Sequence, residues 1–133
     1  MIESVNLSEV TKEVLEVDRI VSAIRGHRFR FSTEAQLCDG IEIVLQKAAL
    51  KFIREHRLDS ESRLDFWVPS LGLCIEVKTK RSEALLLRQL ERYADHPHVR
   101  CLLVVTSRLQ LAALPLTING KPLRVQPLVG NLL

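Results

Sequence analysis

Long apolar runs are missing from this sequence. No window approaches the roughly 18 consecutive apolar residues that a membrane span requires. The segment Met1–Glu9 also lacks the basic start and apolar stretch of a secretory signal. We therefore expect a cytoplasmic protein with no membrane association. Internal repeats and low-complexity segments are absent as well.

Cysteine is scarce. The chain has three, Cys38, Cys74 and Cys101, and each lies in an apolar segment. Their odd number and wide spacing argue against a disulfide framework and a zinc site, so we interpret them as reduced core residues. Histidine clusters only at His96 and His98, with no cysteine or histidine at ligand spacing. That pair is more typical of a helix end than of a metal site.

What is present is an ordinary globular composition. Apolar residues make up 47% of the 133-residue chain and charged residues 26%, which argues against disorder except at the ends. A chain of this length buries about two-thirds of the surface it exposes when unfolded, so we expect one domain over 1–133. The net charge of +3 permits nucleic-acid binding without requiring it.

The N-terminal region predicts an amphipathic helix over 8–25, with Ser8 as a cap and Gly26 as a stop. Apolar residues recur there at intervals of four and three, at Val10, Val14, Val17, Val21 and Ile24. The short seam favours packing on the domain's own core, and the alternative is that residues 1–26 form a dimer element. A second helix is expected from Thr33, because Thr33 and Gln36 have the spacing of a capping box.

Alternating polarity predicts strands over 51–58, 63–68 and 73–77, joined as antiparallel hairpins by turns at 59–62 and 69–72. A third helix is expected over 82–95. The nearly all-apolar segment 100–106 then predicts a doubly buried strand, parallel to an earlier one. The segment 123–128 contains Pro127 and predicts a weaker edge strand. The predicted fold class is α/β, a mixed central sheet flanked by helices in the order α-α-β-β-β-α-β-β.

Two acids and a lysine in the strand region carry the chemistry. Side chains alternate faces along a strand, so Glu76 and Lys78 share one face while the apolar residues between them take the core. Asp65, on the preceding strand, can face them. Both carboxylates, with the carbonyl of Val77, form a hard oxygen site suited to Mg²⁺ or Mn²⁺, and Lys78 can stabilise charge on a phosphate. A solvated acidic strand face is the alternative interpretation.

A second signal lies on the expected third helix. Leu86, Leu90 and Tyr93 form its inward stripe, and Gln89 borders that stripe one turn before Tyr93. An amide and a phenol in this relation can hydrogen-bond a phosphate, a base or a catalytic lysine. The alternative is a bond within the helix face, with Tyr93 in the core.

The order of these residues resembles the PD-(D/E)XK nuclease superfamily. A helix acid, Glu34, is followed by Asp65, by Glu76-Val-Lys78, and then by Gln89-Leu-Glu-Arg-Tyr93, which resembles the QxxxY element of the recombination-exonuclease branch. The resemblance covers a nuclease core over about 33–106 and implies a restriction-endonuclease-like fold, with 107–133 as a C-terminal extension. Leu64 stands where the family name implies proline.

The resemblance also implies roles for individual residues. Asp65, Glu76 and the Val77 carbonyl would be metal ligands, Lys78 the catalytic lysine, Gln89 and Tyr93 substrate-orienting residues, and Glu34 the catalytic helix acid. Glu42 competes with Glu34 for the last role. Further substrate contacts are expected from Lys80, Arg81, Arg88 and Arg92, and the segment before the second helix adds Arg25, His27, Arg28 and Arg30. Phosphate contacts of this kind make affinity salt-dependent without conferring sequence specificity.

The sequence therefore predicts a Mg²⁺- or Mn²⁺-dependent deoxyribonuclease. A structure-selective enzyme that cuts junctions or flaps in recombination, repair or phage and mobile-element DNA processing fits its small size. Two alternatives are a noncatalytic or partner-dependent DNA-binding subunit on a nuclease fold, and a sequence-specific restriction-type endonuclease. DNA is the expected partner, and a homodimer or a protein partner are further expectations.

Overall fold

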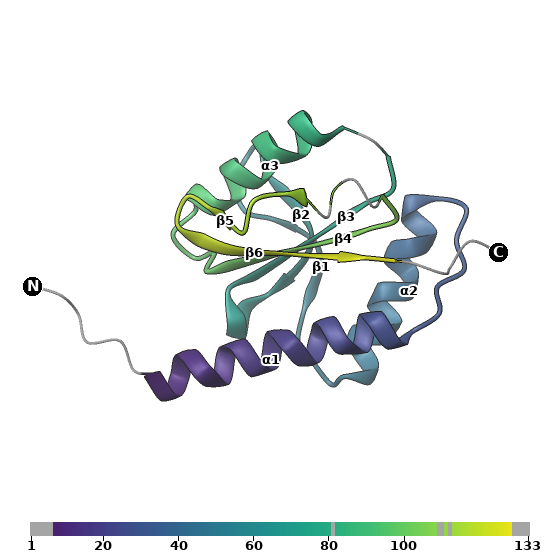
Figure 1. Ribbon diagram of the computed structural model, residues 1–133, viewed down its shortest axis with the longest axis horizontal. Helices are drawn as coiled ribbons and strands as arrows, with labels where there is room; N and C mark the ends of the chain where they lie inside the picture. Colours follow the sequence, from purple (N-terminus) through teal and green to yellow (C-terminus); the bar gives the residue numbers. More distant parts are fainter. Residues whose placement is uncertain (1–6, 81, 109–110, 112, 129–133) are drawn as a thin grey trace, which may run out of the picture.

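The chain forms a mixed β-sheet with helices on both faces (Figure 1). The computed structural model describes residues 7–80, 82–108, 111 and 113–128, with side chains from residue 12 onward. The helices are α1 (Leu7–Gly26), α2 (Glu34–Lys47) and α3 (Glu83–Asp95). The strands are β1 (Ile53–Arg57), β2 (Arg63–Val68), β3 (Leu73–Lys78), β4 (Cys101–Thr106), β5 (Thr117–Ile118) and β6 (Lys121–Pro127), and a 3-10 turn, Pro69–Leu71, joins β2 to β3.

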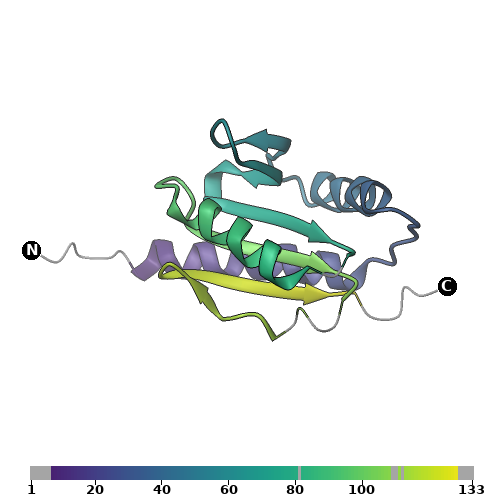
Figure 2. The ribbon, with the colours of Figure 1, turned by 90° about the horizontal axis from the view of Figure 1, so that it is seen from above.

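The strand order is β1-β2-β3-β4-β6-β5. The first three strands pair antiparallel, as the two short turns predicted. Strand β4 runs parallel to β3, and β6 runs parallel to β4. The expected α/β class, the two hairpins and the parallel crossover through α3 are therefore confirmed. The parallel strands β3, β4 and β6 end at the same edge of the sheet (Figure 2).

Two apolar clusters lie on opposite faces of the sheet. Helices α1 and α2 cover one face, where Phe66, Ile75 and Leu103 are buried. Helix α3 covers the other, where Leu64, Cys74 and Leu102 are buried against it (Figures 1 and 2). The expectation that only the Ile75 face of β3 takes the core is wrong, because α3 makes a second core over the face that carries Glu76.

Helix α1 packs on the core of its own chain, as its short seam favoured. Val17, Ile20, Val21 and Ile24 are buried in the cluster beneath the sheet. Val14, earlier in the same seam, is 53% exposed, and the side chain of Val10 lies outside the described part. Helix α2 begins with the expected capping box, in which Thr33 accepts from the Gln36 N–H and the Gln36 side chain accepts from the Thr33 N–H.

The C-terminal region differs from expectation. The strand expected over 123–128 begins at Lys121, and β5 pairs antiparallel with its start, so the strand is not an edge there. Asn119 and Gly120 make the turn, both with positive φ, at 50° and 78°. An Asn-Gly pair between two strands is a strong hairpin signal that the prediction overlooked. Strand β6 therefore lies inside the six-stranded sheet, between β4 and β5.

The cysteines and the histidine pair lie where the sequence predicted. The three cysteines are free, with Cys38 and Cys74 buried and Cys101 partly buried. His96 caps the C-terminal end of α3, which confirms the helix-end interpretation. No helix in the described ranges combines the length and apolar character needed to cross a membrane.

Candidate functional site

The hairpin of β2 and β3 opens at Asp65. The ladder pairs Phe66 with Ile75 and continues away from Asp65, toward Val68. On the other side, the pairing of β2 with β1 skips Asp65 and Glu55, and Glu55 has a positive φ of 55°. Alternate residues of a regular strand share a face, yet Leu64 and Phe66 are buried on opposite faces. The strand therefore changes its parity at Asp65.

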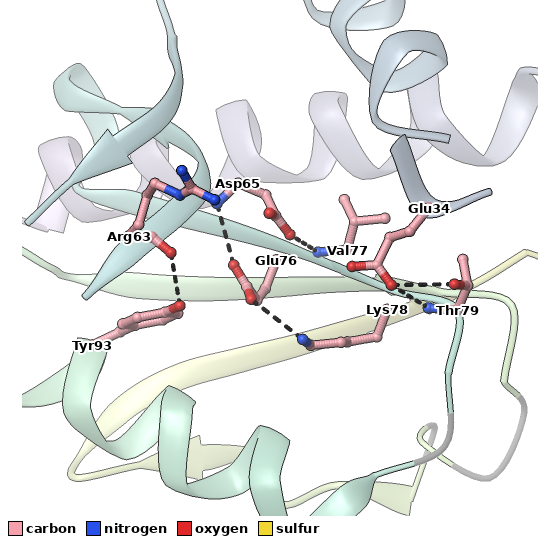
Figure 3. A network of polar contacts seen from close by, with 8 residues as sticks. All are labelled: Glu34, Arg63, Asp65, Glu76, Val77, Lys78, Thr79 and Tyr93. Atoms are coloured by element: carbon pink, nitrogen blue, oxygen red, sulfur yellow. Dashed lines mark hydrogen bonds and ion pairs between the residues drawn. The ribbon is translucent and has the colours of Figure 1, made fainter. Parts of the chain in front are cut away.

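Two carboxylates occupy this opening. The Asp65 N–H donates to Glu76 Oε1 at 3.2 Å, and the Val77 N–H donates to Asp65 Oδ2 at 2.7 Å. Each acid thus takes a backbone donor from the neighbouring strand (Figure 3). The interruption of the sheet brings the two acids together. The Asp65 carboxylate accepts the Val77 N–H, and the Glu76 carboxylate accepts the Asp65 N–H, where a regular ladder would have used backbone carbonyls.

The acids lie in a poorly hydrated environment. Glu76 is 2% exposed, beneath α3. Burial raises the pKa of Glu76 well above its ordinary value, and the charge of Asp65 raises it further. Burial also raises the pKa of Asp65, with a further contribution from Glu34 and an opposing one from the Val77 N–H. Two ionised carboxylates at this site repel each other, so a bound proton or a cation stabilises the pair.

Lys78 follows Glu76 on the same face of β3, as strand alternation predicted. Its Nζ lies 3.9 Å from Glu76 Oε2, and its side chain is 27% exposed (Figure 3). The ammonium lowers the pKa of both acids and so opposes the effect of burial. Lys78 therefore joins the buried acid pair to solvent.

Glu34 reaches the same end of β3 from the start of α2. Its Oε2 accepts from the Thr79 N–H at 3.2 Å and from the Thr79 hydroxyl at 3.1 Å. Glu42, the competing helix acid, instead forms an ion pair with Arg54 at 2.6 Å. The structure therefore places Glu34, and not Glu42, beside the carboxylate pair. The capping box at Thr33 fixes the start of the helix and with it the position of Glu34.

Tyr93 supports the opening from α3. Its side chain is 1% exposed, and its hydroxyl donates to the Arg63 carbonyl at 2.9 Å. Burial raises the pKa of Tyr93, and a hydrogen bond with Gln89 opposes that shift. The phenol thus ties α3 to β2 two residues before Asp65. The sequence predicted an amide and a phenol acting together, and the structure shows the phenol held on the protein backbone.

A cleft of about 600 Å³ opens beside Lys78. Its walls come from the segment before α2, the end of β3 and the first turns of α3. The lining residues are Ser32, Thr33, Glu34, Lys78, Thr79, Lys80, Ser82, Leu85, Leu86 and Gln89. Four residues selected from the sequence, Glu34, Lys78, Lys80 and Gln89, thus share one cavity.

Other selected residues lie outside that cleft. Arg88 and Arg92 are exposed on α3 and do not line it, and Arg81 lies outside the described residues. The sequence prediction overlooked Thr79 and Arg108. Thr79 directly follows Lys78 and anchors Glu34, while Arg108 donates to the Thr79 carbonyl at 2.9 Å. Thr79 was detectable by its place in the motif, whereas Arg108 approaches only through the parallel pairing of β3 and β4.

The acids at this site resemble the donors that Mg²⁺ uses in proteins. No group of three His, Cys, Asp or Glu side chains within the described ranges is arranged to hold a metal ion. Mg²⁺, however, commonly uses one or two carboxylates and completes its shell with water and substrate phosphate. The paired acids and their oxygen-only chemistry fit that requirement. The carbonyl of Val77 stays a predicted ligand.

The site combines residues from three parts of the sequence. The helix acid Glu34, the hairpin acids and Lys78, and the α3 residues Gln89 and Tyr93 surround the end of β3. Such an arrangement can hold a cation next to a phosphate and keep a lysine within reach of both. In comparisons with protein-family models, curated proteins and solved structures the chain has no match, so the contacts within this site carry the functional argument.

Proposed function

We propose that the protein is a metal-dependent deoxyribonuclease with a restriction-endonuclease-like fold. The observation that carries the proposal is the meeting of Asp65 and Glu76 at an interrupted hairpin, with the Lys78 ammonium 3.9 Å from Glu76. Burying two carboxylates lowers the stability of the fold, and such pairs are typical of functional sites. A cation bound beside the solvent-facing cleft would offset the repulsion between them.

Asp65 and Glu76 would hold the metal, together with the Val77 carbonyl. Bound there, Mg²⁺ or Mn²⁺ would supply charge neutralisation at the scissile phosphate and a more acidic bound water. Lys78 stands at the mouth of the pair and would stabilise charge on the phosphate oxygens. Tyr93 would act as a positioning residue, because its hydroxyl holds the β2 backbone beside Asp65.

Glu34 and Gln89 would act within the cleft. Glu34 is partly buried, and its carboxylate bonds the backbone and hydroxyl of Thr79. It contributes to the raised pKa of Asp65, so it adds negative charge that a cation offsets. Gln89 lines the cleft with Lys78 and can bond a phosphate or a base.

The proposed substrate is DNA, cut with selectivity for branched or flapped structures. Lys80 is exposed at the cleft, Arg88 and Arg92 are exposed on α3, and all three would contact the phosphate backbone. A dimer would suit a two-fold symmetric junction. The proposed dimer contact includes Val14, which is exposed on α1.

The test is a cleavage assay with Mg²⁺ or Mn²⁺ on linear duplex, single-stranded, flapped and four-way-junction DNA. Cleavage should require the metal and fall by roughly 10²-fold or more in Lys78→Ala and Glu76→Gln, the loss typical of a removed transition-state contact. Glu34→Gln should also impair cleavage. Glu42→Gln is its matched control, because Glu42 lies on the same helix but pairs with Arg54.

One observation favours a second candidate, a noncatalytic or partner-dependent DNA-binding subunit. Both carboxylates already accept backbone N–H groups, and Glu34 is held by Thr79 rather than by the acid pair. A partner could be required to rearrange them. Metal-independent DNA binding without cleavage of any substrate would favour this candidate and contradict the nuclease.

A further inference from the structure

A second pocket lies at the opposite end of α3 from the cleft. It has a volume of about 690 Å³, within the size range of small-molecule sites. The lining residues are His56, Leu58, Trp67, Pro69, His96, Pro97, His98 and Arg100. None of these belongs to the proposed nuclease site. The two cavities open at opposite ends of α3, and Trp67 in the second one lies two residues along β2 from Asp65.

One wall of the pocket is aromatic. The rings of His56 and Trp67 lie nearly parallel, with their planes 11° apart and their centroids 5.8 Å apart. Trp67 belongs to the core on the α3 side, which fixes the orientation of its indole. The indole itself is only 7% exposed, so the ring that faces the cavity is the partly buried His56 imidazole stacked on it. An imidazole held in this way can stack on the flat face of a nucleobase.

The other wall carries imidazoles and a guanidinium. His96 and His98 have ring centroids 5.3 Å apart in the turn that follows α3. Arg100 at the rim donates to the Ser70 carbonyl at 2.8 Å and to Glu13 at 3.0 Å, which holds the guanidinium in place. The lining includes no carboxylate. These groups are the nitrogen donors that recognise a phosphate.

Two acids near the pocket, Asp59 and Glu13, are held by other partners and do not compete with a bound anion. Asp59 interacts with His96, but its carboxylate accepts the backbone N–H groups of Glu61 and Ser62, both at 2.8 Å. Glu13 is paired with Arg100 on the α1 side. Neither acid lines the pocket. The surroundings therefore leave the imidazoles of the turn facing a cavity with an aromatic wall.

We propose that this pocket binds one unpaired nucleotide, with its base against the His56 imidazole that stacks on Trp67, and its phosphate at His96, His98 and Arg100. As a site that holds a single-stranded part of a substrate beside the cut, it rests on the proposed function. As a nucleotide-binding pocket it does not, because none of its residues takes part in the proposed chemistry. The specificity would be for single strands and ends, since a paired base cannot leave its stack to reach the imidazole of His56.

The test uses the fluorescence of Trp67, the one tryptophan in the sequence. The full-length protein in EDTA is titrated with dTMP, thymidine, inorganic phosphate and the oligonucleotide (dT)8. We expect saturable quenching by dTMP and (dT)8, binding of thymidine roughly tenfold weaker than dTMP because the phosphate contact is missing, and competition by inorganic phosphate without quenching.

Variants separate this pocket from other sites. The double change His96→Ala and His98→Ala should weaken dTMP binding roughly tenfold or more, and Arg100→Ala should weaken it independently. His27→Ala is the matched control, because His27 packs on Phe29 away from the pocket. Unchanged circular dichroism and melting temperature would confirm that the variants fold.

Two results would overturn the proposal. One is the absence of saturable quenching by both dTMP and (dT)8, and the other is quenching that persists unchanged in the double histidine variant. Glu76→Gln should bind dTMP as the wild type does. Loss of cleavage with retained quenching would therefore leave the pocket standing, whereas cleavage without quenching would remove the pocket alone.

Discussion

Glu76 is a buried carboxylate on the face of the sheet that α3 covers, where Cys74 and Leu102 are also buried. Burial dominates its raised pKa, and Asp65 adds to the shift. At pH values below the ordinary carboxyl pKa, Glu76 is neutral in both the folded and the unfolded chain. As the pH rises through the raised pKa of the folded state, ionisation is resisted only in the folded protein, so stability falls.

This sign leads to a prediction for Glu76→Gln in EDTA. The amide can still accept the Asp65 N–H but cannot ionise, so the variant should be more stable than the wild type at pH 8, by about 1–3 kcal/mol. At pH 4.5, near the ordinary Glu value, the difference should shrink. Urea unfolding at both pH values measures it, with the exposed Glu61→Gln as control. An equal difference at both pH values would contradict an ionisation cost at Glu76.

Metal binding at the same acids should reverse that cost. Under the proposed function Mg²⁺ would bind the folded wild type and not the unfolded chain, so it should raise the melting temperature at pH 8. At lower pH protons compete for the carboxylates and the increase should diminish. Differential scanning calorimetry with and without Mg²⁺ measures both effects. A similar increase in Glu76→Gln would place the binding elsewhere.

Tyr93 illustrates a positioning effect at the same scale. Tyr93→Phe removes the hydrogen bond to the Arg63 carbonyl, and the stability should fall by about 1 kcal/mol. If the proposed function holds, kcat should fall while KM changes little, because the β2 backbone beside Asp65 loses its support. Steady-state kinetics on the preferred DNA tests this. Loss of stability with unchanged kcat would restrict Tyr93 to a structural role.

At the scale of the elements, α2 connects a cap to the site. Thr33→Ala removes the hydroxyl that accepts the Gln36 N–H and should destabilise the protein by about 1 kcal/mol. Ser32→Ala is the matched control, since the Ser32 bond to Gln36 comes from its backbone N–H. Urea unfolding compares the two. Equal stabilities would show that the cap does not hold the start of α2.

Helix α1 is the second element with a clear expectation. Ile24→Ala leaves a cavity at a fully buried position in the core under α1 and α2, and the free energy of unfolding should fall by about 2–5 kcal/mol. Val14→Ala, at an exposed position of the same seam, should change the monomer by less than about 0.5 kcal/mol. Thermal unfolding and sedimentation together separate the roles. A concentration-dependent loss of stability in Val14→Ala would instead indicate a dimer contact.

At the scale of the whole molecule, the proposed function predicts that exposed basic residues in and around the cleft set how DNA binding responds to salt. Replacing Lys80, Arg88 and Arg92 by alanine should reduce the slope of log affinity against log salt by about 2–3, close to one per lost phosphate contact. Lys12→Ala, on α1 at the other face of the sheet, is the control. Fluorescence anisotropy at several salt concentrations measures the slope. An unchanged slope would remove these residues from the DNA contact.

Much of the fold followed from local patterns. The capping box at Thr33, the hairpin turns and the apolar strand β4 are decided by residues close in sequence, and all are confirmed. The β5 hairpin also had a local signal in Asn119 and Gly120, which the prediction overlooked. Of the site, the shared face of Glu76 and Lys78 followed from strand alternation.

The sequence by itself determined the order of elements and the identity of the acids, the lysine and the α3 pair, because helix and strand periods act over a few residues. Only the tertiary structure decided that the hairpin opens at Asp65, that α3 buries Glu76, and that Glu34 rather than Glu42 stands beside them. Those outcomes depend on which helices cover each face of the sheet and on where the pairing between strands is interrupted. Both are decided by packing between segments far apart in the chain, which patterns of a few residues cannot reveal.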